Sequence, residues 1–233
     1  MKKIGIMVFA AALIIGIAVG SIFSFGKSDR PFFNFSFNFK GVKGSGNLAT
    51  EARNAAGFKS VDVGGVFQVE ITAQKEFSVE VEADDNLLQY IKTEVRGGTL
   101  YIETSKKIAP AGPIRVRVNA PEIEHLDVSG VANVTANNVK TDEFGIDSSG
   151  ASKVKITGEA AKLNVDVSGA TKIDAEELKV GDANIDASGA SGVTLNVSGE
   201  LRADASGASK VLYSGTPSRV VKSTSGGSRV AAK

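Results

Sequence analysis

Hydrophobic and polar residues alternate along much of the chain after residue 58, and this alternation predicts β-strands with one buried and one solvated face. The period of two is clearest at residues 67–72, 77–82 and 114–119. Residues 84–90 break the alternation and predict a turn or a single helical turn, and Arg96-Gly97-Gly98 predicts a hairpin or a corner between strands. Because helical patterns are scarce, the chain is predicted to be all-β.

A nine-residue motif repeats through the second half of the chain. In its regular copies an aliphatic or small residue and Asp lead to Ser-Gly, and a small residue and a second aliphatic residue follow. The glycine of the motif falls at Gly130, Gly150, Gly169, Gly189 and Gly207, with a weaker copy at Gly226 and a distant copy over residues 61–69. Successive glycines are 18 to 20 residues apart, so the repeat is about 19 residues long.

This period, with strand-like content, fits one coil of a parallel β-solenoid in which each coil stacks on the previous one. The aliphatic ends of the motif can point inward, and Ser-Gly marks a tight bend. We therefore predict an all-β, right-handed parallel β-helix, or β-solenoid, because crossovers between parallel strands are usually right-handed. Residues 121–233 form regular coils, and residues 58–120 form either irregular early coils or a small antiparallel cap.

The bend glycines are predicted to be structural residues. A bulky side chain at any of them is expected to crowd the turn and destabilise its coil. These residues are Gly130, Gly150, Gly169, Gly189 and Gly207.

The N-terminus has the pattern of an export segment. Residues 4–25 contain no charge and follow Lys2 and Lys3, so residues 1–25 are predicted to be either a cleaved signal peptide or an N-terminal membrane anchor. Both alternatives export the rest of the chain to the periplasm or the cell surface, because the positive end stays on the cytoplasmic side. The membrane is then contacted only through this segment.

Residues 26–47 are predicted to be a Phe/Asn-rich tether that leads into a head domain at residues 48–233. In an extended segment, one face would carry Phe33, Phe35, Phe37 and Phe39. This aromatic strip either covers an apolar end of the domain or binds a membrane or a partner. Residues 41–46 are expected to be a flexible joint.

An Asp recurs at the same place in each repeat and would form a column along the stacked coils. The column consists of Asp62, Asp127, Asp147, Asp166, Asp186 and Asp204. Like charges one coil apart repel by about 1 kcal/mol in water, so something should offset them. We favour hydrogen bonds from bend amides or Ser hydroxyls, with Lys153, Lys172, Lys210 and Arg229 as countercharge. The alternative is a cation ladder in which Ca²⁺ binds Asp127, Asp147, Asp166, Asp186 and Asp204.

The composition excludes several kinds of site. With 27 Lys and Arg against 26 Asp and Glu, the chain lacks the basic excess of a nucleic-acid-binding protein. It has no Cys, which excludes disulfides, thiolate metal sites and a lipoprotein cysteine. Its one histidine, His125, has no nucleophile motif around it. Because the Asp residues recur in every coil, as structural residues do, no catalytic residue, cofactor or metal is assigned.

Several blocks of the sequence resemble a known bacterial family. In chain order they are Gly44-Ser45-Gly46-Asn47, Val61-Asp62-Val63, Val66-Phe67-Gln68-Val69-Glu70-Ile71, Val81-Glu82-Ala83-Asp84-Asp85-Asn86-Leu87-Leu88, Gly98-Thr99-Leu100-Tyr101-Ile102 and Ala120-Pro121 with the Ser-Gly-Ala coils. Over residues 44–230 the chain is similar to the family described as putative auto-transporter adhesin, head GIN domain. The resemblance implies a right-handed parallel β-helix-like fold in an exported protein and a role in surface attachment, with no catalytic residues to carry over. The chain lacks the lipoprotein cysteine of many exported relatives, which leaves its mode of anchoring open.

We therefore predict a non-enzymatic, exported envelope protein that serves as an adhesin-like binding or structural module. Its partner is expected to be an envelope or surface ligand, either protein or glycan, and not a nucleic acid. The open ends of a solenoid also allow a homo-oligomer. Two alternatives stay open, namely a polysaccharide-active β-helix enzyme and a cation-stabilised periplasmic scaffold.

Overall fold

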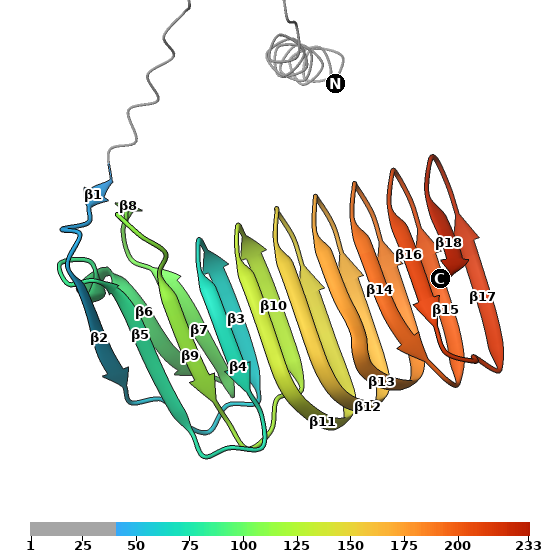
Figure 1. The fold of residues 1–233 in the computed structure, drawn as a ribbon, viewed down its shortest axis with the longest axis horizontal. Coiled ribbons are helices and arrows are strands. Elements are labelled where there is room, and N and C mark those ends of the chain that lie inside the picture. The colour runs from blue at the N-terminus through green and yellow to red at the C-terminus, as the bar shows by residue number, and fades with distance from the viewer. Residues whose placement is uncertain (1–40) are drawn as a thin grey trace, which may run out of the picture. The chain divides into compact units, whose positions relative to one another are not determined.

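The computed structural model describes residues 41–233, which form a row of stacked coils (Figure 1). The repeats form β10 (His125–Gly130), β11 (Asn133–Ser148), β12 (Lys153–Val167), β13 (Lys172–Ala187), β14 (Gly192–Val197), β15 (Glu200–Ala205), β16 (Lys210–Ser214), β17 (Arg219–Thr224) and β18 (Arg229–Ala232). These strands pair with one another in parallel. The predicted all-β solenoid is confirmed, and its right-handed sense stays a prediction.

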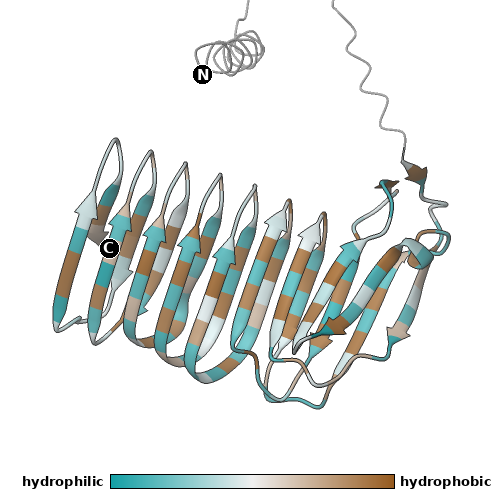
Figure 2. Cartoon of the chain, turned by 180° about the vertical axis from the view of Figure 1, so that it is seen from behind, coloured by the Kyte–Doolittle hydropathy of each residue, from teal (hydrophilic) through white to brown (hydrophobic). Residues whose placement is uncertain are grey.

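Each coil has two long sides, so the coils build two sheets that pack face to face. The long strands β11, β12 and β13 each run through both sheets. Their second halves form one sheet together with β10, β15 and β17, and their first halves form the other sheet together with β14, β16 and β18. Inward residues of both sheets, such as Leu126 and Val134, belong to one hydrophobic core. Figure 2 shows the resulting apolar and polar bands along the strands. Because the core is shared, the outward residues of the two sheets lie on opposite sides of the rod.

Equivalent residues of successive coils stack directly. Val134, Val154 and Ile173 pair in register on one sheet, and Ile146 pairs with Val165 on the other. All five side chains are at most 3% exposed. Since neighbouring strands lie about 4.8 Å apart, each coil buries the apolar side chains of the next.

The early coils do not follow chain order. β3 (Ser60–Gly65) and β4 (Gln68–Thr72) form a coil that lies between the β10–β11 coil and the coil of β7 (Thr99–Thr104) and β9 (Arg115–Asn119). The distant motif copy over residues 61–69 therefore stacks on the first regular repeat. Asp62 pairs with Asp127, and Gly65 pairs with Gly130.

Antiparallel strands close this end of the solenoid. β2 (Leu48–Arg53) pairs with β5 (Ser78–Asp84), β5 pairs with β9, and β6 (Ile91–Arg96) pairs with β7. The break at residues 84–90 contains the 3-10 helix η2 (Leu88–Tyr90), and Gly97 and Gly98 turn the β6–β7 hairpin with positive φ. No helix within residues 41–233 is long and apolar enough to cross a membrane. Residues 58–120 thus combine both predicted alternatives, early coils and an antiparallel cap.

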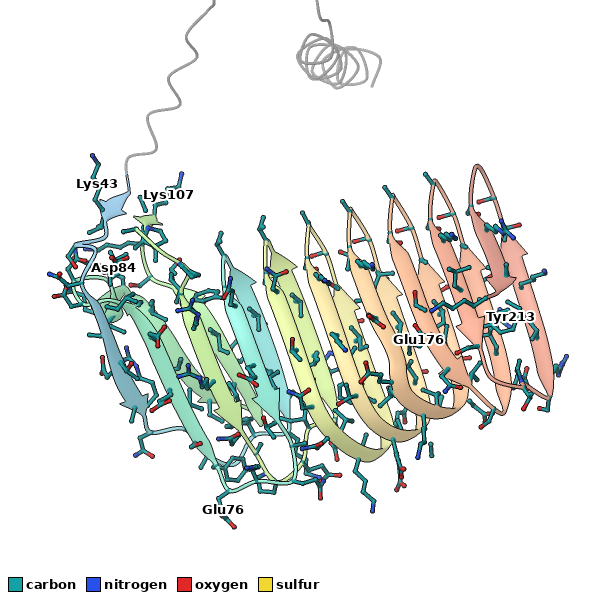
Figure 3. The ribbon with its side chains drawn as sticks, in the orientation of Figure 1. Lys43, Glu76, Asp84, Lys107, Glu176 and Tyr213 are labelled. Carbon is teal, nitrogen blue, oxygen red and sulfur yellow. The ribbon has the colours of Figure 1, made fainter. Side chains whose placement is uncertain are left out.

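The start of the described region is fixed to the fold around Asp84. β1 (Val42–Lys43) pairs with β8 (Ile108–Ala109), so Lys43 and Lys107 lie near each other at this end (Figure 3). Asp84 is 2% exposed and accepts hydrogen bonds from the N–H groups of Gly46 at 2.7 Å and Ala111 at 3.0 Å. Because this buried carboxylate needs those donors, residues 41–46 are held in place, and the prediction of a flexible joint is wrong. The predicted segment 1–25 and the phenylalanine strip lie outside the described residues.

At each end of the described solenoid, one edge strand carries a charged residue at an inward position. Arg53 of β2 pairs with the buried Val79, and Lys222 of β17 pairs with the buried Ala203. Charges on the inward side of an edge strand discourage its pairing with another chain.

Candidate binding face

The predicted Asp column lies on the outward side of the sheet that contains β3, β10 and β15. We call this side the Asp face. Neighbouring members pair in register from coil to coil, and each lies between buried residues of its strand, as Asp127 does between Leu126 and Val128. The column, called here the Asp ladder, consists of Asp62, Asp127, Asp147, Asp166, Asp186 and Asp204. It places one carboxylate per coil at intervals of about 4.8 Å.

The bends do not neutralise these carboxylates. Within residues 41–233, no bend amide or Ser hydroxyl donates a hydrogen bond to the Asp ladder. The bend amides donate instead to the glycine one coil back, as Ala170 N does to Gly150 O at 2.8 Å. The Asp side chains project from the strand before the bend, out of reach of its donors, so the favoured interpretation is wrong.

The Lys column lies on the opposite side of the rod, on the outward side of the sheet that contains β4, β14 and β16. We call this side the Lys face. The column, called the Lys ladder, consists of Lys153, Lys172, Lys210 and Arg229, which are in register across Gly192. All four side chains are exposed. The bend between the Asp and Lys positions reverses the chain, so the two ladders point away from each other. The prediction that these lysines offset the Asp charges is therefore wrong.

A groove of about 670 Å³ opens on the Asp face beside His125. Gly145 lines the groove without a side chain, and a Cβ atom there would collide with Nδ1 of the His125 imidazole. The groove crosses several coils and is rich in carboxylates and carboxamides. Its polar lining includes Glu122, Glu124, Asp142, Glu143, Asp147, Asn164, Asp166, Asn184 and Asp186.

Hydrogen bonds order the side chains within the groove. Asn184 Nδ2 donates to Asn164 Oδ1 at 3.0 Å, and Asn164 Nδ2 donates in turn to Glu143 Oε1. His125 Nε2 lies 3.3 Å from Asp147 Oδ2. The sequence singled out His125 but not Gly145, Asn164 or Asn184, because the position two residues before each Asp varies from coil to coil. The register that brings these residues together was the missing signal.

Burial and repulsion act on one end of the Asp ladder. The pKa of Asp127 is raised, mainly by partial burial and then by the negative charge of Asp147, while His125 opposes the shift. The pKa of Asp62 is also raised, first by burial and then by Asp127 and Glu103. The protein therefore holds these carboxylates at a free-energy cost, which a cation near the ladder would reduce.

The described residues do not assemble a metal site. No group of three or more His, Asp or Glu side chains within residues 41–233 is arranged to hold a metal ion. Ca²⁺ takes about six to eight oxygen ligands, whereas the ladder supplies one carboxylate per coil. Along the described part of the ladder, no set of side chains therefore matches the coordination that Ca²⁺ needs.

The bend glycines form a column along one edge of the rod. Their φ angles lie between 72° and 91°, a range that favours glycine. A Cβ atom on any of them would lie no more than 2.7 Å from the carbonyl oxygen of the glycine one coil back. The column contains Gly130, Gly150, Gly169, Gly189 and Gly207.

A column of buried hydroxyls behind the bends was not predicted. Ser152, Thr171, Ser191 and Ser209 are each at most 4% exposed. Ser209 Oγ donates to Ser206 O at 2.8 Å, which closes the bend. Ser191 Oγ has no partner within the described residues. A Ser or Thr two residues after each bend glycine from Gly150 to Gly207 was the available signal.

A β-solenoid with an open, acidic face is the class of protein that these features define. Residues 57–217 match the family described as putative auto-transporter adhesin, head GIN domain, and the chain belongs to this family. The resemblance drawn from the sequence is confirmed.

Solved structures share the fold. A putative adhesin from Bacteroides fragilis is 19% identical, with a TM-score of 0.69 over 83% of this chain and 100% of its own. A putative adhesin from Parabacteroides merdae is 20% identical, with a TM-score of 0.55 over 82% of this chain and 98% of its own. A structure described as a putative lipid binding protein from Parabacteroides distasonis is 19% identical, with a TM-score of 0.51 over 83% of this chain and 100% of its own. No curated protein matches the chain.

Proposed function

We propose that the chain is a non-enzymatic, adhesin-like binding module of the bacterial cell envelope, and that its Asp face binds a ligand that carries ammonium or guanidinium groups. The observation that carries the proposal is the Asp ladder beside the groove. Within the described residues, Asp127, Asp166 and Asp186 form no ion pair. Their charges are therefore available to a cation.

The shape of the groove favours an extended ligand. Its lining runs from His125 in β10 to Asp186 in β13, and so spans neighbouring coils. No Phe, Tyr or Trp side chain lines it, so a sugar ring would find no large aromatic stacking platform there. Both an amine-bearing glycan and a basic protein segment have the required chemistry, and both fit the expected envelope or surface ligand.

The absence of enzymatic activity is part of the proposal. Catalytic carboxylate pairs need environments that push their pKa values apart. The two ladder members with a resolved shift, Asp62 and Asp127, are raised together, which favours a repeated binding surface. The family description as an adhesin agrees with this assignment.

Export through residues 1–25 completes the proposal and places the head domain in the periplasm or on the cell surface. The uncharged run behind Lys2 and Lys3 supports this address. The family's description as an auto-transporter adhesin supports it as well. A cleaved signal peptide and a retained anchor both satisfy the proposal.

The test is binding of the full-length protein to a lysine oligomer. The groove variant carries Asp147→Asn, Asp166→Asn and Asp186→Asn, and the control carries Glu70→Gln, Asp174→Asn and Glu177→Gln on the Lys face. The groove variant should bind about tenfold more weakly or worse, because each exposed pair contributes up to about 1 kcal/mol. The control should bind like the wild type. Equal losses in both variants would contradict the proposal, as would turnover of an envelope glycan.

A further inference from the structure

We propose that the Asp ladder of one molecule binds the Lys ladder of a second copy, so that the rods associate side by side. This inference rests on the proposed function, because it names the cationic partner of the Asp face. The two ladders lie on opposite sides of one rod. Every molecule can therefore present an acidic face to one neighbour and a basic face to another.

The two ladders have the same spacing because they belong to the same coils. Asp147 pairs with Asp166 on one sheet, and Lys153 pairs with Lys172 on the other. Both rows thus advance by one strand spacing, about 4.8 Å, per coil. When two rods lie parallel, each carboxylate of one ladder can face one cationic group of the other along their length. The match is interrupted at Gly192, which occupies a position of the Lys ladder but carries no charge.

Among the described residues, the ladder charges other than those of Asp147 and Asp204 have no ion-pair partner and are available for this contact. Within residues 41–233, none of Lys153, Lys172 and Lys210 forms an ion pair, whereas other cations of the Lys face do. Lys155 Nζ lies 2.7 Å from Glu177, and Arg117 lies 3.4 Å from Glu80. The free positive charge of this face therefore comes from the Lys ladder.

The contact joins two different surfaces, so it does not close on itself in a two-fold dimer. Heterologous contacts of this kind produce open rows unless a rotation closes them into a ring. Because the charges are exposed, the association should weaken as salt shortens the screening length from about 30 Å at 0.01 M to about 3 Å at 1 M. Charge complementarity would fix the register of the neighbours.

Charge reversal tests this arrangement. One full-length variant carries Asp147→Lys, Asp166→Lys and Asp186→Lys, and the other carries Lys153→Glu, Lys172→Glu and Lys210→Glu. Sedimentation velocity in a mild non-ionic detergent, at about 0.01 M and about 1 M salt, reports association. All proteins retain the same N-terminal segment, and circular dichroism checks that each variant is folded.

The wild type should associate at low salt and dissociate at high salt. Each reversed variant alone presents like charges on both faces and should stay monomeric. An equimolar mixture should associate again, because each variant then supplies the face that the other needs. Association of either variant alone, or a monomeric mixture of folded variants, would overturn the inference.

A lysine oligomer separates this inference from the proposed function. A full-length variant with Lys153→Gln, Lys172→Gln and Lys210→Gln keeps the Asp face intact, gains no new carboxylate and should bind the oligomer. If it binds while the mixture stays monomeric, self-association is wrong and the proposed function stands. If it does not bind, the proposed function itself fails.

Discussion

A Cβ atom on Gly169 would lie 2.5 Å from the carbonyl oxygen of Gly150, one coil back. The φ of Gly169 is also positive, at 79°, so a larger residue meets both a backbone collision and an unfavourable conformation. Gly169→Val is expected to lower the free energy of unfolding by more than about 1 kcal/mol. In a domain of this size that corresponds to a fall in Tm of at least about 2–4 °C.

Gly192→Val is the matched control. No atom lies within 4 Å of the Cβ position at Gly192, which is in strand β14 without positive φ. Its Tm should stay the same or rise, because valine favours strands. An unchanged Tm for Gly169→Val would contradict the stacking of the bends.

Asp127→Asn is expected to stabilise the protein at neutral pH. Since the pKa of Asp127 is raised in the folded state, the folded protein binds more protons than the unfolded chain between the ordinary and the raised pKa. The free energy of unfolding therefore falls as pH rises through that window. Removing the charge should raise the free energy of unfolding by about 0.5 kcal/mol or less at neutral pH. This increase should vanish at pH values below the ordinary pKa of Asp.

Glu143→Gln is expected to lower the free energy of unfolding at neutral pH, the opposite of Asp127→Asn. Hydrogen bonds from Lys162 and Asn164 lower the pKa of Glu143. The ionised Glu143 side chain therefore adds to the free energy of unfolding above its ordinary pKa. This stabilisation is lost as the pH falls through the lowered pKa of the folded state. Urea unfolding of both variants at several pH values measures the two trends. If Asp127→Asn lowered the free energy of unfolding at neutral pH, the account of the Asp ladder would be refuted.

Ser209→Ala is expected to cost about 1 kcal/mol, because it removes a buried hydroxyl that donates to the bend. Ser191→Ala, at the equivalent place one coil earlier, removes a buried hydroxyl without a partner in the described residues. That variant should be neutral or more stable. Thermal unfolding of the pair checks the difference, and equal Tm changes would argue against a role for these hydroxyls in closing the bend.

Lys222→Val is expected to promote aggregation. Lys222 occupies an inward position in β17 beside the buried Ala203, and its charge protects an otherwise unpaired edge. Lys140→Val, at an exposed position in β11, is the control. Light scattering on mild heating should rise for Lys222→Val alone, and similar scattering from both variants would show that the inward position is not special.

The sequence predicted the regular coils well, because their information is local. The interval from Gly150 to Gly169 measures a coil, and the alternation on either side shows which residues point inward. The coil at residues 60–72 could be matched to the repeats, but not placed between residues 99–119 and the first repeat. That placement depends on pairings between strands far apart in the chain.

The candidate site was predicted less well. Asp147 and Lys153 are six residues apart, and in a straight strand an even separation places both on one face. Here the bend at Gly150 reverses the chain between them, so they lie on opposite faces. In the groove, Gly145 pairs with His125 and has no room for a Cβ atom beside its ring. No local motif records this contact between coils.

The central claim, a binding module that works outside the cytoplasm, is tested most directly by protease treatment of the native bacterium. The head domain is followed in intact cells, in cells with the outer barrier opened and in lysed cells, and the mass of the mature chain is measured. We predict cleavage before lysis, with a mass that either lacks roughly the first 20 residues or retains them as an anchor. Protection until the cytoplasm is released would contradict the account.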